Sequence, residues 1–284
     1  MTYRVAAVQM DVAIGDPQTN WAALAERLAT AAANGARLIV APECVLTGYC
    51  FDHRDEAIEA AIPPSAPWWP AIIDACRRAD AFLVLGYLAT DDEGHALHNA
   101  SSLIGPDGIV ATYHKVHLPG LGVDRFVDRG TDGYAVHDAG DARVGLAICY
   151  DCSFPEPMRV LGLAGADIVA LSTNWPVAAS RTAVVVPPAR SMENHYYFVA
   201  ANRIGHERGF KFGGLSSICG PDGVVLASTD RDNDVSLYAD MDLSLARNKT
   251  IRRSSHPDDV DAHVIDRDGD RRPEHYGRLT DPPQ

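Results

Sequence analysis

Short apolar runs alternate along the chain with segments in which apolar residues recur at helical spacing. Four continuous apolar runs are typical of strands buried on both faces of a sheet: residues 36–41, 82–86, 166–171 and 197–201. Three segments have the spacing of amphipathic helices: residues 20–33, 71–78 and 190–195. This alternation predicts an α/β protein with mixed sheets.

Two segments nearly repeat each other. SSLIGPDGIV at 101–110 returns as SSICGPDGVV at 216–225, and in both the Pro-Asp-Gly tight turn joins two apolar stretches into a hairpin. Because the strand-like runs before each hairpin also match, we expect two similar half-patterns. They predict two packed sheets, each covered by helices, within a single domain over residues 1–250.

The last segment, residues 251–284, differs from the rest of the chain. Charged residues, His and Pro dominate it and apolar residues are sparse. We interpret it as a polar tail, either an arm at a subunit interface or a mobile end.

Charge and hydropathy exclude several classes of partner. Lys and Arg total 25 against 38 Asp and Glu, so the formal net charge is −13, which repels nucleic acid and anionic membranes. No run of about 18 apolar residues is long enough to span a membrane. Residues 1–10 lack the features of a signal peptide. We therefore expect a cytoplasmic protein whose six cysteines are reduced.

Cys149 and Cys152 have the C-x-x-C spacing of redox motifs and of half a zinc site. A zinc site needs a second paired arm, and Cys44 with Cys50 has the wrong spacing for one. We expect no metal, and we interpret the cysteines other than Cys149 as small buried apolar residues.

Three chemically distinct side chains stand just beyond predicted strands. Glu43 follows the run that ends at residue 41, Cys149 follows residues 144–148, and Lys115 follows the first hairpin. Alone, each is most often structural: a solvated carboxylate, a surface cation and a core thiol. Together, at the carboxyl ends of strands where α/β proteins bind ligands, they supply the base, oxyanion-stabilising cation and nucleophile of acyl transfer.

The residues after Cys149 predict a helix. Ser153 and Glu156 have the spacing of a capping box, and Pro155 suits the first helical turn. We expect the N-terminus of this helix to favour the Cys149 thiolate. Asp151 either orients the turn or faces solvent.

Three ordered motifs resemble the catalytic motifs of the nitrilase (carbon–nitrogen hydrolase) superfamily: APE at 41–43, HKVHLP at 114–119 and GLAICYD at 145–151. Other segments are similar to further recurrent stretches of the family: FPE at 154–156 with Arg159, TNWP at 173–176, EN at 193–194 and ANR at 201–203. The resemblance implies a four-layer α-β-β-α sandwich with two mixed sheets. It also implies no metal or organic cofactor, and a homodimer or larger homo-oligomer that pairs across its helical faces.

The resemblance also implies roles for individual residues: Glu43 as general base, Lys115 as transition-state stabiliser and Cys149 as nucleophile. Many relatives carry a further Glu after the lysine motif, whereas residues 122–130 here contain none. Asp124 either takes that role with a shorter reach or forms a surface Asp–Arg pair.

These observations predict an amidase that releases ammonia from a small aliphatic amide through a cysteine thioester. The backbone N–H of Tyr150 would share the oxyanion with Lys115. Four residues are candidates for the substrate pocket: Tyr49, Asn174, Trp175 and His195. The alternative for Trp175 is a place in the core, where such a residue more often lies.

Alternative substrates and chemistries stay open. N-carbamoyl amines and nitriles suit the same nucleophile, although Tyr150 and Asp151 follow Cys149 where true nitrilases tend to carry Trp-Glu. A serine amidase using Ser216 or Ser217 lacks a paired lysine motif, and both serines open the second hairpin. A non-catalytic binding module does not explain why Glu43, Lys115 and Cys149 occur together.

Overall fold

Two mixed sheets pack face to face in the computed structural model of the protein, which describes residues 2–230, 232–253 and 263–281. The first sheet has the order β14 (Val235–Asp242), β1 (Thr2–Gln9), β2 (Leu38–Val40), β3 (Phe82–Thr90), β4 (Leu97–Gly105), β5 (Gly108–His114). The second has the order β13 (Val225–Ser228), β12 (Ser217–Cys219), β9 (Tyr197–Asn202), β8 (Ile168–Thr173), β7 (Ala142–Ile148), β6 (Val136–Ala139). The α/β prediction with two mixed sheets is confirmed.

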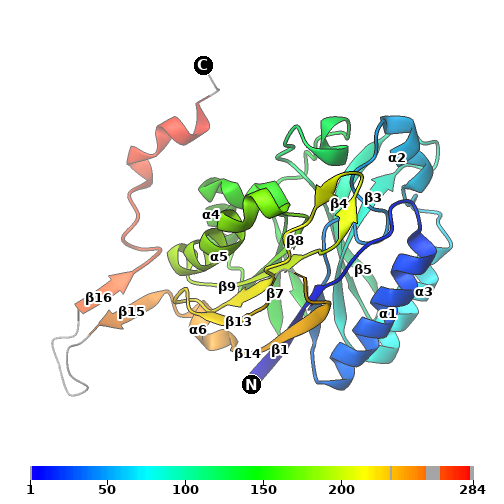
Figure 1. Cartoon of the computed structure of the whole chain (residues 1–284). Helices are drawn as coiled ribbons and strands as arrows, with labels where there is room; N and C mark the ends of the chain where they lie inside the picture. Colours follow the sequence, from blue (N-terminus) through cyan, green and yellow to red (C-terminus); the bar gives the residue numbers. More distant parts are fainter. Residues whose placement is uncertain (1, 231, 254–262, 282–284) are drawn as a thin grey trace.

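Helices cover the outer face of each sheet. Helices α1 (Pro17–Ala33) and α3 (Trp68–Ala79) lie on one side of the molecule, and α4 (Pro155–Leu163) and α5 (Ser180–Asn194) lie on the other (Figure 1). Alternate residues of β1 serve two cores, since Val5 joins the cluster shared by both sheets while Ala6 packs with the α1–α3 layer. The four-layer α-β-β-α sandwich is thereby confirmed. Short α2 (Arg54–Ala60) and α6 (Leu243–Arg247) complete the α-helices among the described residues.

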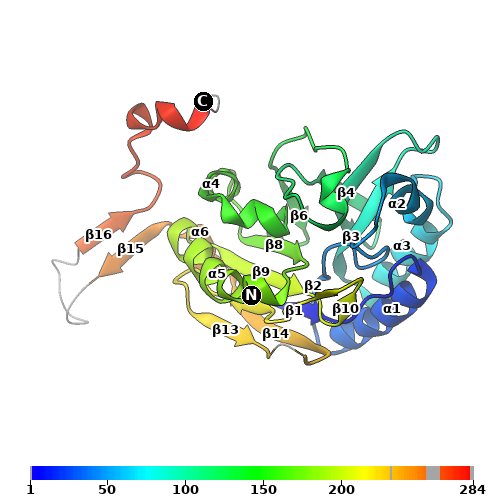
Figure 2. The same cartoon turned by 45° about the horizontal axis from the view of Figure 1, so that its top comes forward.

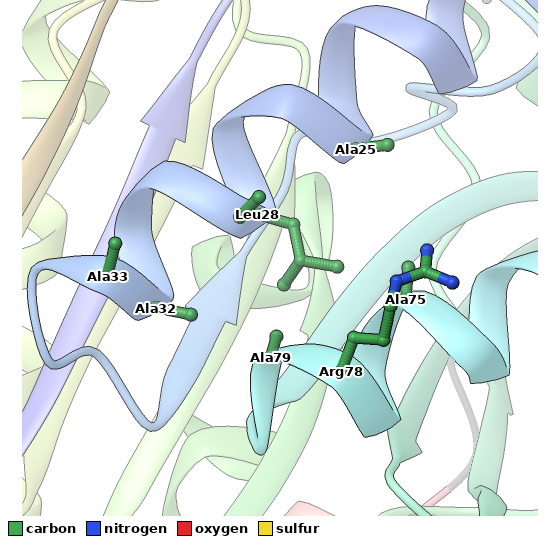
Figure 3. Close-up of a pocket in the computed structure, with 8 residues that line it drawn as sticks. Ala25, Leu28, Ala32, Ala33, Ala75, Arg78 and Ala79 are labelled. Carbon is green, nitrogen blue, oxygen red and sulfur yellow. The ribbon is translucent and has the colours of Figure 1, made fainter.

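The helical layer of the first sheet has a shallow hollow between α1 and α3. Small side chains and one arginine line it, and Figure 3 shows Leu28, Ala32, Ala75, Arg78 and Ala79 around it. It lies on the outer side of the sheet, in the helical layer rather than between the sheets.

The two sheets repeat one topology. In the first sheet, β2 and β3 are parallel, and the antiparallel hairpin β4–β5 then adds to β3. In the second sheet, β8 and β9 are parallel, and the antiparallel hairpin β12–β13 adds to β9 in the same way. Both predicted hairpins are confirmed. A small hairpin of β10 (His206–Glu207) and β11 (Phe210–Lys211) interrupts the second half.

Two helix predictions need correction. Helix α5 begins at Ser180, ten residues before the predicted start at residue 190, and it continues through Pro187 and Pro188. Prolines usually interrupt a helix, but here a buried face that includes Ala183, Pro187 and Ser191 holds the segment in place. The capping box is wrong: α4 begins at Pro155 after Phe154, and no side chain caps it. Ser153 belongs instead to a 3₁₀ turn over Cys149–Ser153. The predicted helix and the place of Pro155 in its first turn are confirmed.

The described part of the C-terminal segment extends away from the sheets (Figures 1 and 2). It forms the hairpin β15 (Thr250–Arg253) with β16 (His263–Asp266), then short 3₁₀ turns over Pro273–His275 and Gly277–Thr280. Residues 254–262 and 282–284 of the predicted tail lie outside the described residues. Within the ranges that the structure describes, no helix has the length and apolarity needed to cross a membrane.

Candidate active site

The carboxyl ends of β2, β7 and β8 meet between the sheets. The Ser172 hydroxyl at the end of β8 donates to the Ala41 carbonyl just beyond β2, at 2.8 Å, so the two sheets touch at this edge. Glu43 stands two residues after Ala41, and Cys149 directly follows β7. The place predicted for both residues, just beyond buried strands, agrees with the structure.

Lys115 joins two carboxylates in a buried cluster. Its Nζ donates to Glu43 Oε1 at 2.7 Å and to Asp124 Oδ2 at 2.5 Å, and all three side chains are shielded from solvent. Asp124 reaches this cluster from the 3₁₀ turn over Gly122–Arg125. The alternative of a surface Asp–Arg pair for Asp124 is therefore wrong.

Asn99 and Tyr49 complete the cluster. Asn99 Nδ2 donates to Glu43 Oε1 at 2.7 Å and to Asp124 Oδ1 at 2.9 Å, while the Tyr49 hydroxyl donates to Asp124 Oδ2 at 2.7 Å. Asn99 is not among the predicted site residues, because it lies within β4 rather than at a strand end. Strand β4 also carries His98, Ser101 and Ser102, so Asn99 is distinguished by its contacts in the structure and not by the sequence.

Burial and mutual charge decide the protonation of this cluster. Burial raises the pKa of Glu43 above its usual value, and the Lys115 charge opposes that rise. For Lys115, burial alone would lower the pKa, but Asp124 and Glu43 together raise it well above its usual value. The two carboxylates therefore favour the charged form of Lys115. Among the described residues, Glu43 Oε2 is buried without a hydrogen-bond partner.

Cys149 occupies a strained turn. Its φ of +41° lies in the left-handed region, and the residue is only 8% exposed. Burial, and then the Glu43 charge, raise the pKa of the thiol well above its usual value, although the Lys115 charge, and after it Thr173 and the Asn174 backbone N–H, act in the opposite direction. The prediction that a helix N-terminus would favour the thiolate is wrong, because burial outweighs it and a 3₁₀ turn separates Cys149 from α4.

The C-x-x-C spacing corresponds to two free thiols. Cys149 and Cys152 are both unbonded, as are the other cysteines of the chain, and all six are buried. Across residues 2–230, 232–253 and 263–281, no group of three His, Cys, Asp or Glu side chains is arranged to hold a metal ion.

Two of the predicted pocket residues lie at the same edge of the second sheet as Cys149. Asn174 and Trp175 follow β8 at the same edge as Cys149, and the buried Asn174 amide has no hydrogen-bond partner within the described ranges. Trp175 is 4% exposed and belongs to the main core. Tyr150 follows Cys149 directly and is partly exposed.

His195 does not lie at the site. It ends α5 and stands two residues before β9, whereas Cys149 follows β7. Since β7, β8 and β9 are parallel, these two positions are at opposite edges of the second sheet. Lys249 Nζ donates to the His195 carbonyl at 2.8 Å. The prediction of His195 as a pocket residue is therefore wrong; a position just after a helix could not show which sheet edge it faced.

A buried ion pair supports the loop that carries Tyr49. Glu207 Oε2 accepts the backbone N–H groups of Tyr49 and Cys50 at 2.9 and 2.6 Å, and its Oε1 accepts from Arg203 at 2.8 Å. Glu207 is not among the predicted site residues, because nothing in the polar sequence around it distinguishes it from a solvated residue.

Comparison with known proteins places this arrangement in a family. The carbon–nitrogen hydrolase family model matches residues 4–250. The chain is 36% identical over 249 residues to a protein named nitrilase from Pyrococcus abyssi, covering 87% of this chain and 93% of that relative. It is 32% identical over 255 residues to an (R)-stereoselective amidase from Pseudomonas sp., covering 84% and 85% of the two chains.

A solved structure gives the same result. An amidase variant from Nesterenkonia sp. AN1, showing the Michael addition of acrylamide at its active-site cysteine, superposes with a TM-score of 0.74. Its sequence is 25% identical, and the match covers 87% of this chain and 96% of that one. The chain therefore belongs to the carbon–nitrogen hydrolase family, as an enzyme of the nitrilase superfamily.

Proposed function

We propose that the enzyme hydrolyses small aliphatic amides to a carboxylic acid and ammonia through a thioester on Cys149. The observation that carries this proposal is the division of labour between the two oxygens of Glu43. Lys115 and Asn99 hold Oε1, whereas Oε2 has no partner in the described part of the chain. A buried carboxylate with one fixed and one free oxygen suits a general base.

Acylation begins with a neutral thiol. Glu43 takes the Cys149 proton as the sulfur attacks the amide carbon, and the carbonyl electron pair moves onto oxygen. Lys115 and the Tyr150 backbone N–H stabilise that oxyanion. The carbonyl then re-forms, the C–N bond breaks, and Glu43 returns the proton to the departing nitrogen, which leaves as ammonia.

Deacylation repeats the sequence with water. Glu43 takes a proton from water as the water oxygen adds to the thioester carbon. The carbonyl of this tetrahedral intermediate then re-forms, and the C–S bond breaks to give the carboxylic acid and the Cys149 thiolate. Glu43 then returns the proton to the sulfur, restoring the thiol. Asp124 is the accessory residue of this scheme, because it accepts a second hydrogen bond from the Lys115 ammonium beside the one to Glu43.

Three residues are proposed to contact substrate. The buried side-chain amide of Asn174 has no hydrogen-bond partner among the residues that the structure describes, and Trp175 follows it along the chain. Tyr49 borders the cluster, with its ring centroid 5.9 Å from Lys115 Nζ. Since its hydroxyl is bound to Asp124, Tyr49 would contribute its ring rather than its hydroxyl to the pocket.

Nitriles are the second candidate substrate, because one similar relative is named a nitrilase. A nitrile develops negative charge on nitrogen and needs early protonation, whereas an amide develops it on oxygen, where a cation and a backbone N–H suffice. Lys115 is such a cation, and its two carboxylates favour its charged form. N-carbamoyl amines differ from amides only beside the carbonyl and remain the alternative on the amide side.

An ammonia-release screen tests the proposal. The purified enzyme is assayed with short aliphatic amides, ω-amides of dicarboxylic acids, N-carbamoyl amines and matching nitriles. We expect the highest kcat/KM for a simple amide, and no turnover by Cys149→Ala. Cys76→Ala, which changes another buried cysteine in α3, is the matched control and should stay active. A nitrile preferred over its own amide would contradict the proposal.

We also propose that residues 1–250 form one catalytic domain, that the chain assembles into a homodimer or larger homo-oligomer, and that it works in the cytoplasm. Exposed apolar side chains on α4 and α5 support assembly, among them Val160, Leu163, Val184 and Val185. The family match, which ends at residue 250, supports the domain boundary. Six free cysteines are typical of a reducing compartment.

A further inference from the structure

The carboxylate of Asp151 is buried behind the nucleophile and accepts several hydrogen bonds. Its Oδ2 accepts the Ile148 backbone N–H at 2.9 Å and the Tyr113 hydroxyl at 2.8 Å. Its Oδ1 accepts the His117 backbone N–H at 3.3 Å and the Tyr134 hydroxyl at 3.0 Å, and lies 2.9 Å from His117 Nδ1. No part of Asp151 is exposed.

These donors come from both catalytic segments. Tyr113 and His117 stand two residues before and two residues after Lys115, so Asp151 holds the lysine segment on both sides. Ile148 immediately precedes Cys149, and Asp151 itself follows Cys149 by two residues. One carboxylate therefore connects the backbone around the nucleophile to the backbone around the cation.

We propose that Asp151 is a positioning residue that sets the separation between the Lys115 ammonium and the Cys149 sulfur. It acts through Tyr113, His117 and Ile148 and does not itself touch the reacting atoms. The proposal rests on the proposed function in one respect, that Cys149 is the nucleophile and Lys115 stabilises the charge that develops next to it.

Substitution by Asn disturbs this connection whichever way the amide lies. A carboxylate only accepts, whereas one end of an Asn side chain donates. Oδ2 faces the N–H of Ile148 and Oδ1 faces the N–H of His117, so either orientation of the amide sets two donors against each other. One of the two catalytic segments must then move, and a displacement of about 1 Å is enough to cost on the order of 10²-fold in rate.

The first experiment compares Asp151→Asn with Asp138→Asn, which changes an exposed carboxylate on the neighbouring strand β6. We expect Asp151→Asn to lower kcat at least ~10-fold with KM changed less than ~3-fold. Alkylation of Cys149 by iodoacetamide, followed by mass spectrometry, should slow by a similar factor without any substrate present. Asp138→Asn should behave as wild type in both assays.

A second variant keeps the test decisive if Asp151→Asn folds poorly. Tyr134→Phe removes one donor to Asp151 and leaves the carboxylate in place, so we expect a smaller slowing of Cys149 alkylation with little loss of melting temperature. A lower melting temperature with unchanged kcat and alkylation in both Asp151→Asn and Tyr134→Phe would overturn the proposal.

A double substitution separates positioning from general stability. When Lys115→Met has already removed the ammonium, adding Asp151→Asn should slow Cys149 alkylation far less than it does in the wild type. An equal effect in both backgrounds would overturn the proposal. If no amide is hydrolysed while alkylation follows the expected pattern, the substrate class is wrong and the role of Asp151 stands.

Discussion

One ammonium group is shared by two carboxylates at the centre of the site. Lys115 contacts both Glu43 and Asp124, and none of the three side chains is exposed, so the buried cluster has one more negative than positive charge when all are ionised. An uncompensated buried charge is costly, and removing one partner of a buried pair destabilises more than the pair itself stabilises. The catalytic and structural roles of these residues are therefore linked.

Loss of Lys115 should cost more stability than loss of Asp124. Lys115→Met leaves two buried carboxylates without their cation, and we expect the free energy of unfolding to fall by about 3–5 kcal/mol. Asp124→Asn leaves Glu43 and Lys115 as a balanced pair and should cost clearly less. Urea unfolding at pH 7 measures both values. Equal losses would show that the cluster is not held by its charge balance.

The pH dependence of the reaction should reflect Glu43. Burial raises its pKa above 4.5, and the base must be ionised, so kcat/KM should fall as the pH decreases through a value above 4.5. Asn99 donates to Glu43 and lowers that pKa. Asn99→Leu should therefore move the acidic limb to higher pH.

The control for this shift is Ser101→Ala. Ser101 is also buried on β4, and its hydroxyl has no hydrogen-bond partner among the described residues. Its removal should leave the acidic limb of the kcat/KM profile in place. An acidic limb that is identical in wild type and Asn99→Leu would contradict the assignment of Glu43 as the titrating base.

At the scale of the elements, the loop that carries Glu43 depends on a close approach of two backbones. A Cβ on Gly86 of β3 would lie 2.3 Å from the Pro42 carbonyl oxygen and 2.7 Å from the Cys44 nitrogen. Because both neighbours are backbone atoms, no side-chain rotation relieves the contact. Only glycine at this position of β3 allows the loop to lie against the strand.

Gly86→Ala should therefore displace Glu43. We expect kcat to fall at least ~10-fold and stability to fall by about 1–3 kcal/mol, as overpacking of a core does. The control is Gly120→Ala, since a Cβ at that exposed position meets nothing within 4 Å. A Gly86→Ala enzyme with normal kcat would show that the loop adjusts without moving its carboxylate.

The sequence was most informative where structure is local. Continuous apolar runs and Pro-Asp-Gly turns depend on neighbouring residues, so the strands around Glu43 and Cys149 and both hairpins were predicted correctly. Contacts between distant segments were not predictable in this way. Asn99 and Glu207 act on residues 56 and 158 positions away, and no local pattern marks such partners. Prolines that usually end helices likewise concealed most of α5.

At the scale of the whole molecule, the polar C-terminal segment is the part least involved in the sandwich. The described residues 263–281 project from the body, and Tyr276 and Leu279 are exposed apolar side chains on it. With Leu163 of α4, these two residues line a groove between the segment and the helical layer. An arm that extends over a second copy would cover these apolar groups.

Removal of residues 254–284 should separate assembly from folding. We expect the shortened chain to fold with a cooperative melting transition, as the full chain does. We also expect it to form smaller assemblies than the full chain, as measured by light scattering after size-exclusion chromatography. Leu279→Ser is a milder version that should weaken assembly in the same direction. An unchanged molar mass for the shortened chain would exclude the segment as an interface arm.

The duplicated topology also divides the chemistry unequally. The first half of the chain supplies Glu43 and Lys115, and the second half supplies Cys149, so each half is an incomplete enzyme. Strand β14 of the second half pairs antiparallel with β1 of the first half, with Thr2 opposite Asp242 at one end and Gln9 opposite Val235 at the other. This pairing gives two separate polypeptides a surface for reassociation. Cleavage within the exposed residues 131–133 should yield two inactive fragments that recover amidase activity when mixed. The rate of ammonia release would then measure how much of the two fragments has reassociated, because neither fragment is active without the other.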